Sequence, residues 1–184
     1  TYRGESGGLN EANSDIFGTM VEFYGQGGGL AAGASTIPAT GGNWTIGEQL
    51  ATPSFNKPLR YMYKPSLDGK SPDAWSKSTG RLDVHYSSGP ANHFMFLLAH
   101  GSQIDALSGN IQSPMANGVT SITGLGNTLA SKIWFKALTS YMTSSTNYAG
   151  ARTATLSACT ALGYPAGSTV YNTVNTAWLA INVK

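Results

Sequence analysis

Hydrophobic residues near the start of the chain recur every three or four positions, as they do along one face of an α-helix. This spacing predicts a helix over residues 8–24, with an apolar face made of Leu9, Ala12, Ile16, Met20 and Phe23. The same segment carries three acids that fall within about 40° of one another at 3.6 residues per turn, namely Glu11, Asp15 and Glu22. Neighbouring like charges destabilise an exposed helix by about 0.2–0.5 kcal/mol per pair. This acidic stripe therefore indicates either a bound cation or a face open to solvent.

Helical periodicity returns in the second half of the chain and predicts a mainly α protein. The later helices are expected over residues 88–101, 127–142, 148–162 and 170–181. The first of them has Pro90 near its start and Gly101 at its end, as helix boundaries favour. Ser168 is the expected N-cap of the last helix, because its hydroxyl can accept from a free backbone N–H of the first turn.

The stretch between the first and the later helices shows no sustained period. Residues 25–36 are rich in Gly but lack the Lys-Ser/Thr pair of a phosphate-binding loop, which predicts a flexible surface loop. Residues 37–87 mix Pro, Gly, Ser and aromatic residues, which predicts long loops with short turns. We therefore expect one domain over residues 1–184, a helical bundle with a long irregular loop region after its first helix.

Composition narrows the classes of function. A chain of 184 residues with a net charge of +2 is too near neutral to indicate a nucleic acid or an anionic membrane as partner. No run approaches the roughly 18 apolar residues of a membrane span, and the low share of charged residues, 11%, is compatible with a secreted protein. Cys159 is the single cysteine, so no disulfide forms within the chain, and its helical spacing predicts a buried thiol.

The three histidines do not form a metal site by themselves. No pair has the i, i+4 spacing of two ligands on one helix. His93 and His100 lie seven residues apart on one face, which favours surface or helix-end positions. His85 differs, because Asp83 two residues earlier would point the same way in an extended segment and hold the imidazole, raising its pKa. Such a histidine can donate a proton or stabilise an oxyanion.

Longer stretches carry a much more specific pattern: YRGESGGLNEANSDIFGTMVEFY (2–24), NWTIGEQL (43–50), PLRYMYKPSLDG (58–69), LDVHYSSGPANHFMFLLA (82–99) and GNTLASKIWFKALTSYMTSSTNYAGARTATLSA (126–158). Together they resemble the C-terminal half of a thermolysin-like zinc metallopeptidase. The sequence DVHYSSG is most similar to the vibriolysin and pseudolysin branch. The resemblance extends from Tyr2 to the terminal NVK, and it implies the helical C-terminal domain of that fold.

The resemblance implies metal-binding roles for the acidic stripe, with zinc and calcium as cofactors. Glu11 matches the third zinc ligand, and Asp15 matches the acid that accepts a hydrogen bond from a zinc-binding histidine. Glu22 matches a calcium ligand, and Asn43 and Glu48 fall where further calcium ligands are expected. If calcium holds this region, the loop over residues 25–57 should become sensitive to proteolysis when calcium is removed.

The resemblance also implies the catalytic and substrate-binding residues. His85, oriented by Asp83, and Tyr2 match the residues that stabilise the oxyanion of the tetrahedral intermediate. Arg60 matches the arginine that binds a substrate carbonyl. Leu59 and Ile46 would line the pocket for the residue after the scissile bond, which implies cleavage before large apolar residues.

One part of the family pattern is absent. The two histidine ligands and the general base come from an H-E-x-x-H helix about twenty residues before the matched glutamate, and this sequence contains no H-E-x-x-H. We therefore expect the chain to be half of a secreted zinc metalloendopeptidase, inactive alone, with the N-terminal half of the same peptidase and a peptide or protein substrate as partners. The alternatives are a noncatalytic peptide-binding module and a structural helical module.

Overall fold

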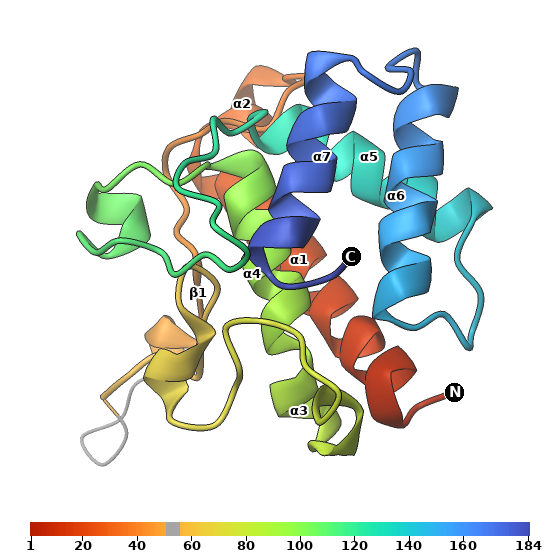
Figure 1. Ribbon diagram of the computed structural model, residues 1–184. Helices are drawn as coiled ribbons and strands as arrows, with labels where there is room; N and C mark the ends of the chain where they lie inside the picture. Colours follow the sequence, from red (N-terminus) through yellow and green to blue (C-terminus); the bar gives the residue numbers. More distant parts are fainter. Residues whose placement is uncertain (51–55) are drawn as a thin grey trace.

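The computed structural model describes residues 1–50 and 56–184, and the protein is mainly helical, as predicted (Figure 1). Its α-helices and strands are, in chain order, α1 (Gly4–Gln26), α2 (Gly29–Ala32), β1 (Thr45–Ile46), β2 (Arg60–Tyr61), α3 (Val84–Ser87), α4 (Gly89–Ala99), α5 (Asn127–Ser140), α6 (Tyr148–Ala161) and α7 (Thr169–Ala180). Short 3₁₀ turns lie at Glu48–Leu50, Pro65–Asp68, Thr79–Arg81 and Ala106–Ser108.

Helix α4 lies at the centre of the helices (Figure 1), and all of its residues are buried. A helix that is largely apolar around its circumference is typical of a core element. It packs against α1, α5 and α7. Phe94 of α4 stacks on Trp178 of α7 with ring centroids 3.9 Å apart. The buried apolar residues of the described chain form one cluster that includes this stack.

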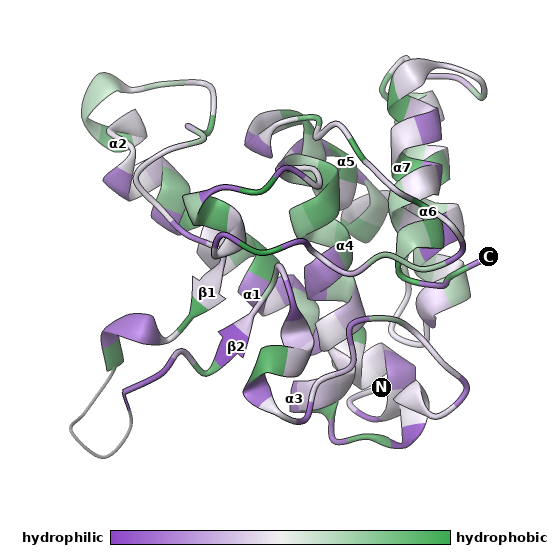
Figure 2. Ribbon diagram, turned by 60° about the vertical axis from the view of Figure 1, so that its left-hand side comes forward, coloured by the Kyte–Doolittle hydropathy of each residue, from purple (hydrophilic) through white to green (hydrophobic). Residues whose placement is uncertain are grey.

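The two short strands are antiparallel and lie beside α1 (Figure 2), with Ile46 paired to Arg60. Trp44, which precedes β1, is buried and contacts both Phe23 of α1 and Phe96 of α4, with ring centroids 5.4 Å apart in each pair. Buried aromatic side chains contribute large apolar areas. The aromatic contact of Trp44 therefore fixes the strands, and with them Ile46 and Arg60, against the first helix.

All five predicted helices are present, and the differences lie at their ends and in the glycine-rich run. Helix α1 begins at Gly4 rather than at residue 8. The sequence pattern did not reveal this first turn, because it is rich in Gly and Ser and has no apolar periodicity. The prediction of a loop over residues 25–36 is wrong for residues 25 and 26, which end α1, and for one further turn, which forms α2. Gly28 and Gly33 flank that turn with φ of 83° and 61°, a conformation that glycine adopts without steric cost. Ser168 caps α7 as predicted, since its side chain accepts from the backbone N–H of Tyr171.

One prediction about the histidines is wrong. His93 lies neither at the surface nor at a helix end but inside the core, because α4 has no exposed face. Its Nδ1 lies 2.7 Å from the carbonyl of Asp73 and its Nε2 lies 2.6 Å from Ser113 Oγ. Burial lowers the pKa of His93. Cys159 is buried as predicted. Within residues 1–50 and 56–184, no helix combines the length and the apolar character that crossing a membrane requires.

Candidate functional site

The start of α1 approaches α3 so closely that only glycine fits. A Cβ on Gly7 would lie 2.5 Å from Val84 Cγ1, and a Cβ on Gly8 would lie 2.4 Å from Ser87 Oγ. The hydroxyl of Tyr148, at the start of α6, donates to the carbonyl of Ser87 at 2.6 Å and so holds α3 from the other side. These contacts place α3 directly beside the next turn of α1.

Four residues from two distant parts of the sequence, the start of the chain and the start of α3, come together at this contact. Tyr2 donates its hydroxyl to Glu11 Oε1, and His85 Nε2 lies 3.7 Å from Glu11 Oε2. His85 Nδ1 lies 2.7 Å from Asp83 Oδ1. We call Tyr2, Glu11, Asp83 and His85 the carboxylate–histidine cluster. It lies at the surface, with the His85 side chain 53% exposed.

The pairing of Asp83 with His85 arises differently from the prediction. The segment is not extended: Asp83 is the N-cap of α3, and its Oδ1 accepts from the backbone N–H of His85 at 2.9 Å as well as from the ring. These hydrogen bonds, the backbone one first, lower the pKa of Asp83. The hydrogen bond to Glu11 raises the pKa of Tyr2, with desolvation and the Glu11 charge adding to it. Asp83 is therefore an anion at neutral pH and Tyr2 a protonated donor.

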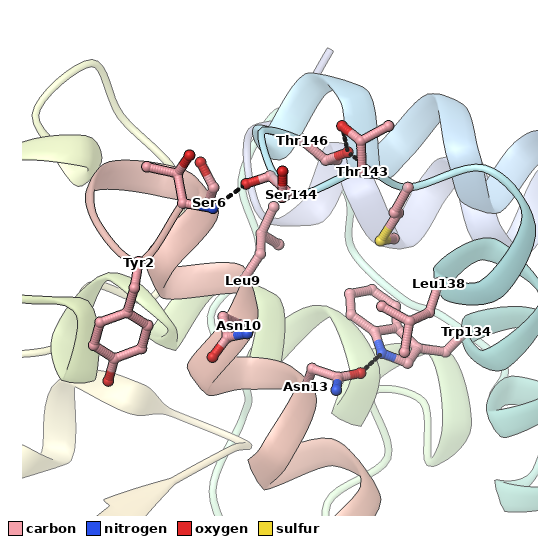
Figure 3. A pocket seen from close by; sticks show the side chains of 12 residues that line it. Tyr2, Ser6, Leu9, Asn10, Asn13, Trp134, Leu138, Thr143, Ser144 and Thr146 are labelled. Atoms are coloured by element: carbon pink, nitrogen blue, oxygen red, sulfur yellow. Dashed lines mark hydrogen bonds between the residues drawn. The ribbon is translucent and has the colours of Figure 1, made fainter.

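The segment before α1 determines where Tyr2 points. The backbone nitrogen of Thr1 donates to the carbonyl of Ser144 in the turn between α5 and α6. Between α1 and this turn lies a pocket of about 220 Å³, which Leu138 of α5 also lines. Figure 3 shows the ring of Tyr2 turned away from Ser144, on the outer side of α1. The hydroxyl thereby reaches Glu11, two turns further along the helix.

Asp15, one turn after Glu11, forms a second group with Arg60 and Asn92. Arg60 binds it through two parallel hydrogen bonds, Nε to Oδ2 and Nη2 to Oδ1, both 2.8 Å long. Asn92 Nδ2 donates to Asp15 Oδ2 at 2.7 Å. The Asp15 side chain is only 7% exposed and that of Arg60 is 20% exposed. Bidentate pairing of this kind is the strongest that a carboxylate forms with a side chain, so Asp15 is held rigidly.

The residues predicted to bind substrate lie next to this group on the paired strands. Leu59 donates its backbone N–H to the carbonyl of Ile46 at 2.7 Å. Its side chain is 42% exposed and covers Gly47, where a Cβ would lie 2.8 Å from Leu59 Cδ1. Arg60 follows directly in β2. Leu59, Arg60 and Ile46 are thus adjacent on the paired strands.

The residues predicted to bind calcium form a third group at the far end of α1. Asn43 Nδ2 donates to Glu22 Oε1 at 3.1 Å and to Glu48 Oε1 at 2.9 Å. The backbone N–H of Asn43 also donates to Glu22 Oε1, at 3.0 Å. We call Glu22, Asn43 and Glu48 the amide–carboxylate group. Its amide nitrogen, a donor, lies between the two carboxylates. A calcium ion takes six to eight oxygen ligands, so the group as arranged does not fit this ion.

Comparison with known proteins agrees with this fold. A family model described as "Thermolysin metallopeptidase, alpha-helical domain" matches residues 1–183. The chain belongs to this metallopeptidase family. It is 49% identical over 184 residues to the transglutaminase-activating metalloprotease of Streptomyces mobaraensis, a match that covers 100% of the chain and 23% of that protein.

Two further relatives are more distant. The chain is 37% identical over 187 residues to a thermolysin of Alicyclobacillus acidocaldarius subsp. acidocaldarius, which covers 99% of the chain and 29% of that protein. It is 36% identical over 188 residues to a bacillolysin of Bacillus cereus, which covers 100% of the chain and 28% of that protein. The chain thus spans less than a third of these relatives. The resemblance to the thermolysin-like family is confirmed, whereas the vibriolysin and pseudolysin branch stays a prediction.

Members of the thermolysin metallopeptidase family depend on zinc. Within residues 1–50 and 56–184, no three His, Cys, Asp or Glu side chains are grouped so as to hold a metal ion. Glu11 fits as a single carboxylate ligand, because it faces the surface beside His85. A zinc site needs at least two further protein ligands besides such a carboxylate.

Two features of the site were not found from the sequence. The sequence does not single out Asn92, yet this residue donates to Asp15, and its Oδ1 is buried without a hydrogen-bond partner among the described residues. The signal available was a polar residue that interrupts an otherwise apolar helix. The close contact through Gly7 and Gly8 was missed as well, although two adjacent glycines inside a helix indicate close packing.

Proposed function

We propose that this chain is the helical half of a secreted zinc metalloendopeptidase that cleaves peptide bonds before large apolar residues. The observation that carries the proposal is the carboxylate–histidine cluster, in which Tyr2 and His85 both face Glu11. A carboxylate flanked by a protonated hydroxyl and an imidazole offers one metal ligand and two oxyanion donors at one place. Membership of the thermolysin metallopeptidase family supports the same reaction.

Glu11 is the third zinc ligand in this proposal, and two histidines of the missing half are the others. Zinc, when bound, supplies an activated water and a polarised substrate carbonyl. Asp15 accepts a hydrogen bond from one of those histidines and so orients it. Arg60 and Asn92 hold the carboxylate of Asp15 in place.

Tyr2 and His85 stabilise the negative charge that develops on the substrate oxygen. The Tyr2 hydroxyl is a protonated donor, because its pKa is raised. Asp83 holds Nδ1 of His85, so Nε2 faces the site and donates when the ring carries both protons. Donors fixed before the reaction contribute most to such stabilisation. Arg60 binds a substrate carbonyl, and Leu59 and Ile46 accept the apolar side chain that follows the scissile bond.

The partner is the N-terminal half of the same peptidase, and the isolated chain has no peptidase activity. To test this, the chain is assayed with a fluorogenic peptide that carries Leu after the scissile bond, in the presence of zinc. We expect no turnover by the chain alone and turnover after reconstitution with the N-terminal half. Glu11→Gln should abolish the reconstituted activity, and His85→Ala should lower kcat by about 10²–10³-fold.

The matched control is Glu48→Gln, which makes the same chemical change in the amide–carboxylate group and should leave kcat unchanged. Turnover by the chain alone would refute the dependence on a second half. Full activity of the Glu11→Gln complex would refute the zinc-ligand role. A reconstituted complex that binds the peptide without hydrolysing it would favour the noncatalytic peptide-binding module instead.

A further inference from the structure

The segment before β1 is joined to α1 by one amide. Asn43 Nδ2 donates to Glu22 of α1 at 3.1 Å and to Glu48 at 2.9 Å, so both of its hydrogens are used. Thr45 Oγ1 also lies near this group, 3.2 Å from Glu48 Oε2. The two carboxylates are therefore held together by donors that belong to the protein itself.

The direction of the Asn43 amide is fixed by its backbone surroundings. The backbone N–H of Thr45 donates to Asn43 Oδ1 at 2.8 Å, and the Thr45 hydroxyl donates to the same oxygen at 2.5 Å. A backbone N–H can only donate, so it identifies the atom that it faces as the oxygen. Turning the amide over would set two N–H donors against each other and would direct the oxygen at two carboxylates. Asn43 can therefore present only its nitrogen to Glu22 and Glu48.

This arrangement puts a donor where a cation would have to lie. A hard cation such as calcium needs oxygen ligands on all sides, and the N–H hydrogens carry partial positive charge that repels it. Two carboxylates close together still require compensation of their charge. Burial raises the pKa of Glu22, the backbone hydrogen bond from Asn43 lowers it, and the charge of Glu48 raises it further. The amide supplies this compensation without a metal.

We propose that in this chain the Asn43 side chain takes the place of a calcium ion between Glu22 and Glu48, so that the attachment of this segment to α1 is independent of calcium. The proposal does not rest on the peptidase activity, because it concerns a group at the opposite end of α1. It also reverses the sequence-based expectation that removal of calcium exposes this region to proteolysis.

The test is a thermal melt of the purified chain in excess EDTA and in millimolar calcium chloride. A calcium ion at a hundred times its dissociation constant raises the Tm of a chain of this size by about 5–10 °C, whereas we expect the wild-type Tm to differ by no more than about 1 °C. Limited proteolysis between residues 33 and 44 should likewise proceed at the same rate in both buffers. A calcium-dependent rise of about 5 °C or more in the wild type would overturn the proposal.

Asn43→Asp tests the role of the amide, because it replaces the donor by a third carboxylate and so creates an oxygen-lined group. We expect this variant to melt lower than the wild type in EDTA and to regain about 5–10 °C in calcium. If it does not fold in EDTA, Asn43→Asp/Glu48→Gln removes one charge again and should restore folding without calcium. Asn172→Asp adds the same charge at an exposed position on α7 and should show no calcium effect. A Tm of Asn43→Asp that equals the wild type in both buffers would also overturn the proposal.

Discussion

The pair of Arg60 and Asp15 allows the sharpest prediction about stability. Replacing Arg60 by Met keeps most of the aliphatic stem but removes both hydrogen bonds to Asp15, each 2.8 Å long. The carboxylate of Asp15 is 7% exposed and would retain Asn92 as its donor. A charge would thus be left largely buried with one hydrogen bond instead of three.

The size of the effect follows from the burial of the two partners. Removing one partner of a fully buried ion pair costs about 3–5 kcal/mol, because the other charge loses its compensation. The Arg60 side chain is 20% exposed, so water would partly solvate the carboxylate that Arg60→Met leaves behind. We therefore expect a loss of about 2–3 kcal/mol, which corresponds to a fall in Tm of about 5–10 °C for a chain of this size.

The assay is urea unfolding of four proteins: the wild type, Arg60→Met, Asp15→Asn and the double variant. Because Asp15→Asn removes the charge that Arg60 compensates, the double variant should be more stable than the sum of the two single losses predicts, by about 1.5–3 kcal/mol. Arg81→Met is the matched control at an exposed position and should change stability by no more than about 0.5 kcal/mol. Additive losses, or an Arg60→Met variant within that same margin, would refute the assignment of this pair as buried and coupled.

Two further predictions concern buried titratable groups. Burial raises the pKa of Cys159 to about 11, so the thiol of the native protein should not react with a disulfide reagent at pH 8. One equivalent of thiol should react only after denaturant is added. Rapid labelling of the native chain would contradict this. Burial lowers the pKa of His93, so the unfolded chain binds a proton that the folded chain does not, and stability should fall as the pH drops below about 6.5. His93→Asn should unfold more readily at neutral pH but lose less stability between pH 7.5 and 5, as measured by urea unfolding; an unchanged pH dependence would contradict the assignment.

The helices could be predicted because their apolar residues keep a regular period, and the exceptions have physical reasons. The first five residues of α1 include Gly4, Ser6, Gly7 and Gly8, which show no apolar periodicity. The helix needs small residues there because it approaches α3 closely. His93 shows the converse. A polar residue in an apolar helix was assigned to the surface, whereas tertiary contacts with Asp73 and Ser113 satisfy both of its nitrogens in the core.

The candidate site could be predicted only in part from local sequence. Asp83 and His85 lie two residues apart, so their contact was within reach of a local argument, although the backbone geometry came out differently. Tyr2, Glu11 and His85 come together because α1 packs against α3. Their shared role could be expected only from the family resemblance. The contact of Arg60 with Asp15 joins residues 45 positions apart, so no local sequence pattern predicts it.

The acidic stripe on α1 illustrates how tertiary contacts resolve a local repulsion. Asp15 is compensated by a guanidinium and an amide, so it needs neither a cation nor full exposure to solvent. Glu22 accepts from the amide of Asn43, which compensates its charge in the calcium-independent attachment proposed above. Glu11 differs, because its neighbours are a neutral hydroxyl and a histidine at 3.7 Å. Coulomb attraction to a cation is greatest where no fixed positive partner already occupies the carboxylate. Of the three acids, Glu11 is therefore the one at which a metal ion would gain the most, which agrees with the role proposed for it.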